Sequence, residues 1–378
     1  MSSVRGRVRF EKRLDVAKRM TYLVPLMSVG AALVVGAILL LATGHNPIDT
    51  YHKVFSRGFG SRSSLSGTVG LATPILFTGL AAAAAFRMGL FNIGGEGQLI
   101  MGAVGASGVA IALSDQAAPV IFIAMVVAGM VCGGLYALVP GFLKARFKTS
   151  EIITSLMMNY IAAIVLNYLI FNSTSYWRDP KSKGFPTGKA IVTAAQWNEF
   201  TVSDVVVPLG FVVASIAAAV VWGLYKKTRF GFEVNVVGDS PVAARYAGVN
   251  TRRKVLTVMG ISGALAGLGG ASDIGDFRHV LDAKGLSQAG YGYTGIVVAA
   301  LARLNPLAVI VVAIVMGGLT NAGYALQGPD FPSGLVGTLQ GLILFCTVAG
   351  EVLTRYRVRI NRRTVAPSPS GPAEVSAA

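Results

Sequence analysis

The chain has 378 residues, of which 53% are hydrophobic and only 13% are charged, with a mean hydropathy of +0.62. Soluble globular proteins carry about 25% charged residues, so this composition excludes an ordinary soluble enzyme or binding domain. In a soluble protein the net charge of +16 would suggest a nucleic-acid partner, but no RNP-like or zinc-finger pattern accompanies it, so none is expected.

Ten segments of at least 18 residues contain no Asp, Glu, Lys or Arg. In chain order they are 21–48, 63–86, 97–114, 116–143, 152–177, 205–225, 255–272, 285–302, 304–329 and 331–350. An α-helix needs about 20 apolar residues to cross the hydrocarbon core, and it satisfies its own backbone hydrogen bonds there. A transmembrane β-barrel would instead show alternating segments of about ten residues. The sequence therefore predicts an all-α polytopic membrane protein with about ten transmembrane helices.

The Lys and Arg residues between these segments predict the orientation of the chain. If the N-terminus is cytoplasmic, 24 of the 33 basic residues lie in cytoplasmic segments and nine in external ones. This asymmetry follows the positive-inside rule, so both termini are predicted to be cytoplasmic. The excess of positive charge is then expected to contact anionic lipid of the inner leaflet.

The segments outside the helices divide the chain into three predicted parts. Residues 1–20 form a basic cytoplasmic arm, and residues 21–353 form the transmembrane domain. Residues 354–378 form a cytoplasmic tail that is basic and then, because it is rich in Pro, Ser and Ala, disordered. Two loops of the transmembrane domain are long enough to carry function: the external loop 172–203 and the cytoplasmic loop 226–254.

The first unusual element in chain order is the glycine-rich segment 89–97, between the second and third predicted helices. It holds four glycines together with Asn92 and Glu96. Glycine at this density disfavours a continuous helix, by up to about 1 kcal/mol each relative to Ala. Two alternatives are open. The segment is either a solvated cytoplasmic turn or a helix break that lines a water-filled path, where Asn92, Glu96 and Gln98 contact a polar solute.

Polar residues inside the later helices are further candidates for the same path. Asn159, Tyr160 and Asn167 lie within about 100° of one another on a helical wheel. They either line the path or only hydrogen-bond to neighbouring helices, as buried polar side chains in membranes commonly do. For Asn321 and Gln340 we expect the second, structural role.

The cytoplasmic loop 226–254 carries the clearest local pattern. Asp239 or Ser240 is a good helix N-cap, Pro241 suits the first helical position, and Gly248 suits the position after the helix. The pattern predicts a short, small-faced helix that either docks in a groove of a partner or is a plain connector. The residues expected to contact a partner are Asp239, Ser240, Pro241, Ala243, Ala244, Arg245 and Gly248.

Motifs for catalysis are absent from the full sequence. There is no GxxxxGK[ST] phosphate loop and no HExxH motif, and the three His residues lie in external segments. No metal site and no cofactor are expected on this chain, and if transport is driven by ATP, another subunit must supply the ATPase. The ten charge-free segments also count against an ion-coupled carrier, which usually places ionisable residues at mid-membrane.

Four blocks of the sequence resemble one family. They read FNIGGEGQ at 91–98, SEIITSLMMNY at 150–160, TRFGFEVNVVGDSPVAARYAGV at 228–249, and GYGYTGI at 290–296 followed by Asn305-Pro306. The chain is similar here to ABC importer permeases of the branched-chain amino acid, ribose and nucleoside group. The FNIGGEGQ form most resembles the nucleoside (simple-sugar) branch.

The resemblance implies a permease subunit, not an enzyme, that imports nucleosides across a bacterial cytoplasmic membrane by alternating access. It implies a second permease in a heterodimer, cytoplasmic ATPase subunits that bind ATP and Mg, and an extracytoplasmic solute-binding lipoprotein. The helix at 241–247 would dock into the ATPase. The alternatives are a permease for ribose-like sugars or another small polar solute and, from another class, an ion-coupled secondary carrier.

Overall fold

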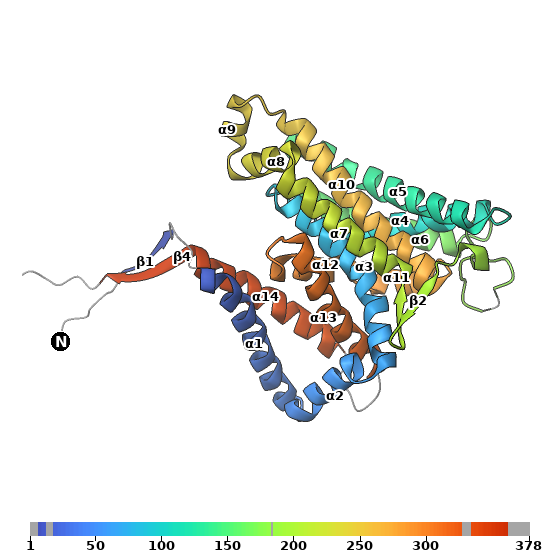
Figure 1. Ribbon diagram of the computed structural model, residues 1–378, viewed down its shortest axis with the longest axis horizontal. Helices are drawn as coiled ribbons and strands as arrows, with labels where there is room; N and C mark the ends of the chain where they lie inside the picture. Colours follow the sequence, from blue (N-terminus) through green and yellow to red (C-terminus); the bar gives the residue numbers. More distant parts are fainter. Residues whose placement is uncertain (1–6, 13–17, 183, 327–333, 362–378) are drawn as a thin grey trace, which may run out of the picture.

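The computed structural model describes residues 7–12, 18–182, 184–326 and 334–361. Helices dominate it (Figure 1), which confirms the predicted helical class. In chain order the elements are β1 (Arg7–Lys12), α1 (Lys18–Ala42), α2 (Pro47–Phe59), α3 (Arg62–Phe86), α4 (Gly95–Ala112), α5 (Ala118–Phe147), α6 (Glu151–Phe171), η1 (Thr193–Ala195), β2 (Glu199–Val202), β3 (Val205–Pro208), α7 (Leu209–Lys227), α8 (Arg229–Asp239), α9 (Pro241–Tyr246), α10 (Thr251–Ser272), η2 (Asp273–Arg278), α11 (Ala283–Gln288), α12 (Tyr291–Leu301), α13 (Pro306–Ala325), α14 (Leu335–Arg355) and β4 (Tyr356–Asn361).

The long helices coincide with the charge-free segments of the sequence. Nine of the ten segments hold most of one helix, whereas segment 285–302 is divided between α11 and α12 at Gly290, whose φ is +64°. Among the described residues, six helices are long and apolar enough to cross a membrane, and α1 with α2, bent by 120°, make a seventh if they count as one span. The count of ten spans and the cytoplasmic termini stay predictions.

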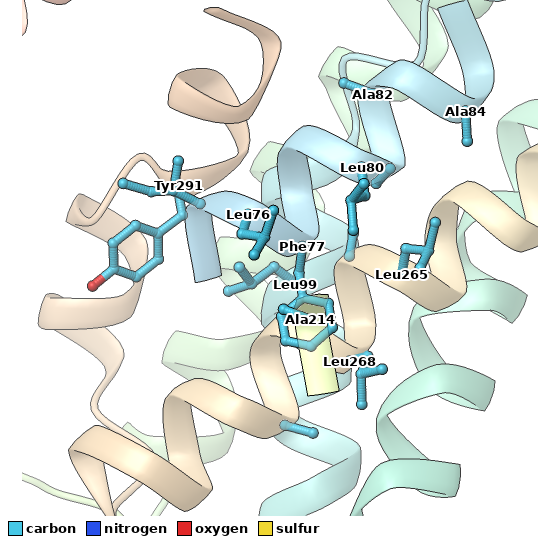
Figure 2. Packing of buried hydrophobic residues seen from close by; sticks show 14 of the residues in the cluster. Leu76, Phe77, Leu80, Ala82, Ala84, Leu99, Ala214, Leu265, Leu268 and Tyr291 are labelled. Carbon is cyan, nitrogen blue, oxygen red and sulfur yellow. The ribbon is translucent and has the colours of Figure 1, made fainter. Parts of the chain in front are cut away.

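The core is built around α3, α4 and α10. The most apolar windows of α3 and α10 are 83% and 72% buried, whereas those of α5, α6, α7 and α13 are only 22–33% buried. Figure 2 shows Phe77 and Leu80 of α3 meeting Leu99 of α4 and Leu265 and Leu268 of α10. The outer helices therefore present wide apolar faces, as expected where lipid or another membrane subunit covers them.

Glycines let α5 and α10 approach closely. Gly129 and Gly133 on α5 face Gly263 and Gly267 on α10, and a Cβ on Gly129 would lie 2.9 Å from the Gly267 carbonyl oxygen. On each helix the two glycines are four residues apart, so they lie on the same face. Small residues at such spacing are the usual means of packing membrane helices backbone to backbone.

Among the described residues, two short two-stranded antiparallel sheets lie outside the helices. In the described parts of the predicted arm and tail, β1 pairs with β4 in antiparallel register, an interaction between distant segments that the helical pattern did not predict. Residues 18–20 of the predicted arm begin α1, residues 354–355 of the predicted tail end α14, and residues 1–6, 13–17 and 362–378 lie outside the described residues. The hairpin of β2 and β3 begins within the loop 172–203 at one end of the bundle, and α8 and α9 lie at the opposite end (Figure 1).

Candidate functional site

Residues 87–94 form a buried, irregular connection from α3 to α4. Asn92 is 3% exposed and Glu96, in the first turn of α4, is 4% exposed, whereas Phe91 is half exposed. Irregular backbone at membrane depth persists only where protein or water satisfies its polar groups. Glu96 is therefore not solvated, as the alternative of a plain turn expected, and a path lined by this segment stays a prediction. We call residues 87–94 the buried loop.

Asn92 is held from both sides. Its Oδ1 accepts from Gly94 N–H and Gln98 Nε2, each at 3.0 Å, and its Nδ2 donates to Gln98 Oε1 at 3.0 Å and Ser262 Oγ at 2.9 Å. Ser262 Oγ in turn donates to the Ala81 carbonyl at 2.7 Å. The four main bonding positions of the Asn92 amide are therefore occupied. In this conformation Asn92 and Gln98 join α3, α4 and α10, and neither amide is directed at a solute.

Glu96 joins the start of α4 to the start of α12. Its carboxylate accepts from Gly290 N–H at 3.1 Å and from Gly292 N–H at 2.5 Å. A carboxylate is favoured at a helix N-terminus, where backbone N–H groups lack helical partners. The backbones also touch, because a Cβ on Gly292 would clash with the backbone of Glu96. Glycine is thus required at position 292 by the proximity of α4.

Asn159 connects α6 to the same region. Its Oδ1 accepts from Gly97 N–H at 2.9 Å, and its Nδ2 donates to the Ile93 carbonyl at 2.9 Å and to the Tyr293 hydroxyl at 3.3 Å. Ser155, one turn earlier, accepts from Ile93 N–H at 3.1 Å. The structure therefore brings Asn159 together with Asn92, Glu96 and Gln98 around one buried loop, although the sequence separates them by more than 60 residues.

The other two predicted residues of α6 lie on its exposed side. Tyr160 is 59% exposed, and Asn167 is exposed and donates to the Ala163 carbonyl of its own helix at 2.9 Å. The buried stripe consists of Glu151, Ser155, Asn159, Ala162, Leu166 and Ile170. With 100° between successive residues, Tyr160 falls outside that stripe. Contact of Tyr160 and Asn167 with a path stays a prediction, and in the described chain they do not meet the buried loop.

The short helix predicted within the loop 226–254 is present as α9. Ser240 is its N-cap, with Oγ accepting from Ala243 N–H at 3.2 Å, and Pro241 is its first residue. Gly248 follows the helix with φ of +77°, a conformation that favours glycine. The structure thus confirms the predicted caps and selects Ser240 over Asp239.

The small residues of α9 were expected to form its exposed, partner-facing side, and the structure shows a different exposed side. Ala244 is fully buried, and its carbonyl accepts from Val249 N–H at 2.9 Å. Ala243 and Arg245 are exposed, and the largest exposed apolar side chains are Val242, at 54%, and Tyr246, at 91%. A partner that docks here would touch Val242 and Tyr246, while Ala244 packs against its own chain.

Helix α8 links α9 to the buried loop. Arg87 Nε donates to Asn235 Oδ1 of α8 at 3.2 Å, and its guanidinium lies 5.5 Å from the centre of the Tyr225 ring. A Cβ on Gly238 would lie 2.9 Å from the Arg87 carbonyl oxygen, so α8 packs directly on the end of α3. Displacement of α8 would therefore push on the first residues of the buried loop.

A cavity of about 770 Å³ lies between α12, α13 and α14. Gln340 of α14 bridges it, with Nε2 donating to Thr320 Oγ1 at 3.1 Å and Oε1 lying 3.4 Å from Thr294 Oγ1. The residues that line it are Gln288, Ala289, Gly290, Tyr293, Thr294, Val297, Thr320, Gly323, Tyr324, Gly334, Leu335, Val336, Gly337, Gln340, Gly341 and Leu344. Glu96 borders this cavity indirectly, through Gly290.

The sequence did not single out this cavity. Gln340 was expected only to bond neighbouring helices, which it does, but it also faces the cavity. Asn321 has the structural role expected, because its Nδ2 donates to the Ser64 carbonyl at 2.9 Å. The sequence shows polar and small residues on three separate helices. Their spacing within each helix does not show that the three helices bring these residues together.

Residues 64–348 match the protein family described as "Branched-chain amino acid transport system / permease component". The chain belongs to this family. The match covers most of the transmembrane helices and confirms the resemblance carried by the four sequence blocks. The protein is thus an ABC transporter permease, an integral membrane transport subunit and not an enzyme.

Three relatives illustrate the range of similarity. The permease is 37% identical over 309 residues to the guanosine ABC transporter permease protein NupP of Bacillus subtilis, covering 80% of this chain and 86% of that one. It is 31% identical over 373 residues to the glucose ABC transporter permease protein TsgB13 of Haloferax volcanii, covering 93% and 94%. It is 29% identical over 329 residues to the nucleoside ABC transporter permease protein NupB of Lactococcus lactis, covering 85% and 89%.

Proposed function

We propose that this permease is one subunit of an ATP-driven importer that moves nucleosides into a bacterial cell. The observation that carries the proposal is the 37% identity to a guanosine permease over 80% of the chain. A nucleoside presents ribose hydroxyls and a base edge to polar groups, and a flat base to apolar ones. A cavity with a few placed polar groups in a largely apolar wall suits such a ligand.

The proposal includes three partners: a second permease in a heterodimer, a cytoplasmic ATPase that holds ATP and Mg, and an extracytoplasmic solute-binding lipoprotein. The exposed side of α9, with Val242 and Tyr246, is the proposed contact with the ATPase. Closure of the ATPase would move α9 and α8, and α8 contacts the buried loop at Arg87. In this account Asn92, Glu96, Gln98 and Asn159 hold the loop in place for alternating access.

A sugar is the second candidate solute, because a glucose permease is 31% identical over 93% of this chain. Ribose-like sugars or another small polar solute would use the same hydroxyl-binding groups. An ion-coupled carrier is the alternative from another class, and its uptake would follow an ion gradient instead of ATP.

Competition for uptake tests the proposal. Cells whose own nucleoside transporters are deleted would express the permease with its partner subunits and receive labelled uridine. We expect unlabelled adenosine and guanosine to suppress uptake at concentrations where ribose and glucose do not. Suppression by ribose or glucose and not by nucleosides would replace the nucleoside proposal with the sugar alternative. Cells expressing the complex without its ATPase serve as the control for background uptake.

A further inference from the structure

Residues 279–290 form a segment that leads from one end of the bundle into its interior. The segment follows η2, contains α11 and ends at Gly290, where α12 begins. Figure 1 places α11 at the end of the bundle that carries β2. The first residue of α12, Tyr291, accepts at its carbonyl from Thr78 Oγ1 at 2.8 Å, and Thr78 lies well inside α3. We call residues 279–290 the return segment.

Arg278 fastens the start of the return segment through a buried ion pair. Its Nε donates to the Asp273 carboxylate at 2.6 Å, its Nη2 donates to the Gly285 carbonyl at 3.3 Å, and its Nη1 lies 3.7 Å from the Asp282 carboxylate. The Asp273 side chain is 1% exposed and that of Arg278 is 13% exposed. Ionisable side chains within membrane helices are costly and commonly mark functional positions. Arg278 thus ties the end of the long α10 span to α11.

The loop 172–203 also binds the start of the return segment. Ile191 N–H donates to the His279 carbonyl at 2.9 Å, and Gly188 N–H donates to the Leu281 carbonyl at 3.2 Å. These bonds pair backbone with backbone, as neighbouring strands do. The start of the return segment is therefore held by backbone bonds from the loop and by side-chain bonds from Arg278.

The return segment carries features of an element that has a second arrangement. His279 has a φ of +55° and Gly290 a φ of +64°, so both of its ends are in a conformation that is uncommon outside glycine. The buried atoms His279 Nδ1 and Ser287 Oγ have no hydrogen-bond partner among the described residues. A buried polar atom without a partner costs free energy. The ion pair of Arg278 offsets that cost in the arrangement seen here.

We propose that the Arg278–Asp273 ion pair is a latch that holds the return segment closed at the β2–β3 end of the permease, and that its release is a step of transport. Arg278 is a positioning residue in this account, because it acts through the return segment and does not line the cavity. Glu96 bonds Gly290 N–H at the other end of the segment. Separation of the ion pair would therefore free the start of the segment while its end stays attached to α4.

Reaction of a single cysteine with a membrane-impermeant maleimide tests the latch. Ser287→Cys puts the thiol where a buried Oγ lies, on a chain in which Cys132→Ala and Cys346→Ala remove the native thiols. The complete transporter would be labelled in right-side-out and in inside-out membrane vesicles. Lys181→Cys, exposed in the loop 172–203, identifies the vesicles in which the reagent reaches this end of the permease.

The latch variant combines Arg278→Gln with Asp273→Asn. It removes both charges of the ion pair, so neither is left buried without a partner. The matched control is Lys284→Gln, which removes a positive charge from an exposed position of the same segment. Arg278→Lys is an intermediate variant, because an ammonium keeps the charge but lacks the fork of donors that reaches Asp273 and Gly285 together.

We expect the latch variant to label about tenfold faster than the unlatched-charge control, which corresponds to about 1.4 kcal/mol in the equilibrium between the closed and open segment. The control should label like the parent chain, and Arg278→Lys should lie between them. All variants should match the parent in yield and melting temperature. In proteoliposomes the latch variant should lose maximal rate of guanosine uptake at an unchanged KM, a readout that alone rests on the nucleoside function proposed above.

Equal labelling rates in the latch variant and the Lys284→Gln control would overturn the latch. A latch variant that fails to assemble, or that melts well below the control, would make the ion pair a folding element and would overturn it too. Faster labelling with unchanged uptake would contradict release of the pair as a step of transport. If the parent complex transports no guanosine, the nucleoside function fails, and the labelling rates still decide the latch.

Discussion

At the scale of single residues, Glu96 shows how a polar group in a membrane protein is used for structure. It is the only carboxylate between residues 50 and 114, and the sequence identifies it as unusual for that reason. Its two oxygens accept backbone N–H groups of Gly290 and Gly292, almost 200 residues later. Removal of this carboxylate would leave two buried N–H groups without acceptors, which costs free energy. We therefore expect its loss to destabilise the contact between α4 and α12.

Glu96→Gln is expected to destabilise the permease and reduce uptake. The amide can accept from one of the two glycine N–H groups, but its own NH₂ group then faces the other donor. An unsatisfied buried donor costs about 1–3 kcal/mol. The measurement is the melting temperature of the purified complex together with nucleoside uptake. Glu199→Gln on β2, which is exposed, is the control. Equal melting temperatures for both variants would contradict a structural role for Glu96.

At the scale of helices, close packing depends on glycines that face one another. Gly267 of α10 lies against Gly129 and Gly133 of α5, and Gly102 of α4 approaches the same backbone. Three helices therefore converge on one glycine near the centre of the bundle. The spacing of four between glycines was visible in the sequence, but the identity of the partner helix was not, because every long segment carries many small residues.

Gly267→Ala should destabilise the protein by about 1–3 kcal/mol, because the added methyl group collides with the backbone of α5 and cannot rotate away. Gly223→Ala on α7 is the matched change in an open position, where a Cβ meets no atom within 4 Å. Alanine is the better helix former, so the control should be neutral or slightly stabilising. Thermal unfolding in detergent separates the two. A Gly267→Ala variant as stable as the Gly223→Ala variant would exclude the close crossing.

The exposed and buried sides of α9 should respond differently to charge. Tyr246→Asp is expected to leave expression unchanged and to reduce binding of the ATPase, because Tyr246 is 91% exposed. Ala244→Asp is expected to lower expression, because Ala244 is fully buried and a carboxylate there has no partner. Co-purification of the ATPase, normalised to permease yield, measures the effect. Val202→Asp, exposed at the opposite end of the bundle, is the control.

A Tyr246→Asp variant that retains the full amount of ATPase would show that α9 is an ordinary connector. A well-expressed Ala244→Asp variant with normal melting temperature would contradict the burial of Ala244. The two predictions, ATPase contact through Tyr246 and burial of Ala244, are independent, so one can be contradicted while the other holds.

At the scale of the whole molecule, hydropathy predicted the membrane class and the position of most helices. It could not predict the division at Gly290, because residues 285–302 remain uniformly uncharged across the break. The two long loops lie at opposite ends of the bundle (Figure 1), as their predicted placement on opposite sides of a membrane requires. The cap residues of α9 were predictable because capping depends on neighbours in sequence, whereas the cavity depends on three helices that only packing brings together.

The molecule also contains a continuous series of contacts from α9 to the cavity. Helix α8 touches Arg87, the buried loop leads to Glu96, and Glu96 holds Gly290 at the cavity wall. Contiguity of this kind is consistent with coupling between α9 and the cavity, but coupling is a free energy that only a transport measurement can reveal. The central claim is therefore best tested on the assembled transporter.

The most direct measurement is uptake of labelled guanosine by proteoliposomes that contain this permease, its partner permease, the ATPase and the solute-binding protein. We predict accumulation that requires ATP and Mg, that stops with an ATPase whose phosphate loop is mutated, and that is insensitive to collapse of the proton gradient. Accumulation without ATP that follows an imposed proton or sodium gradient would contradict the account and favour an ion-coupled carrier.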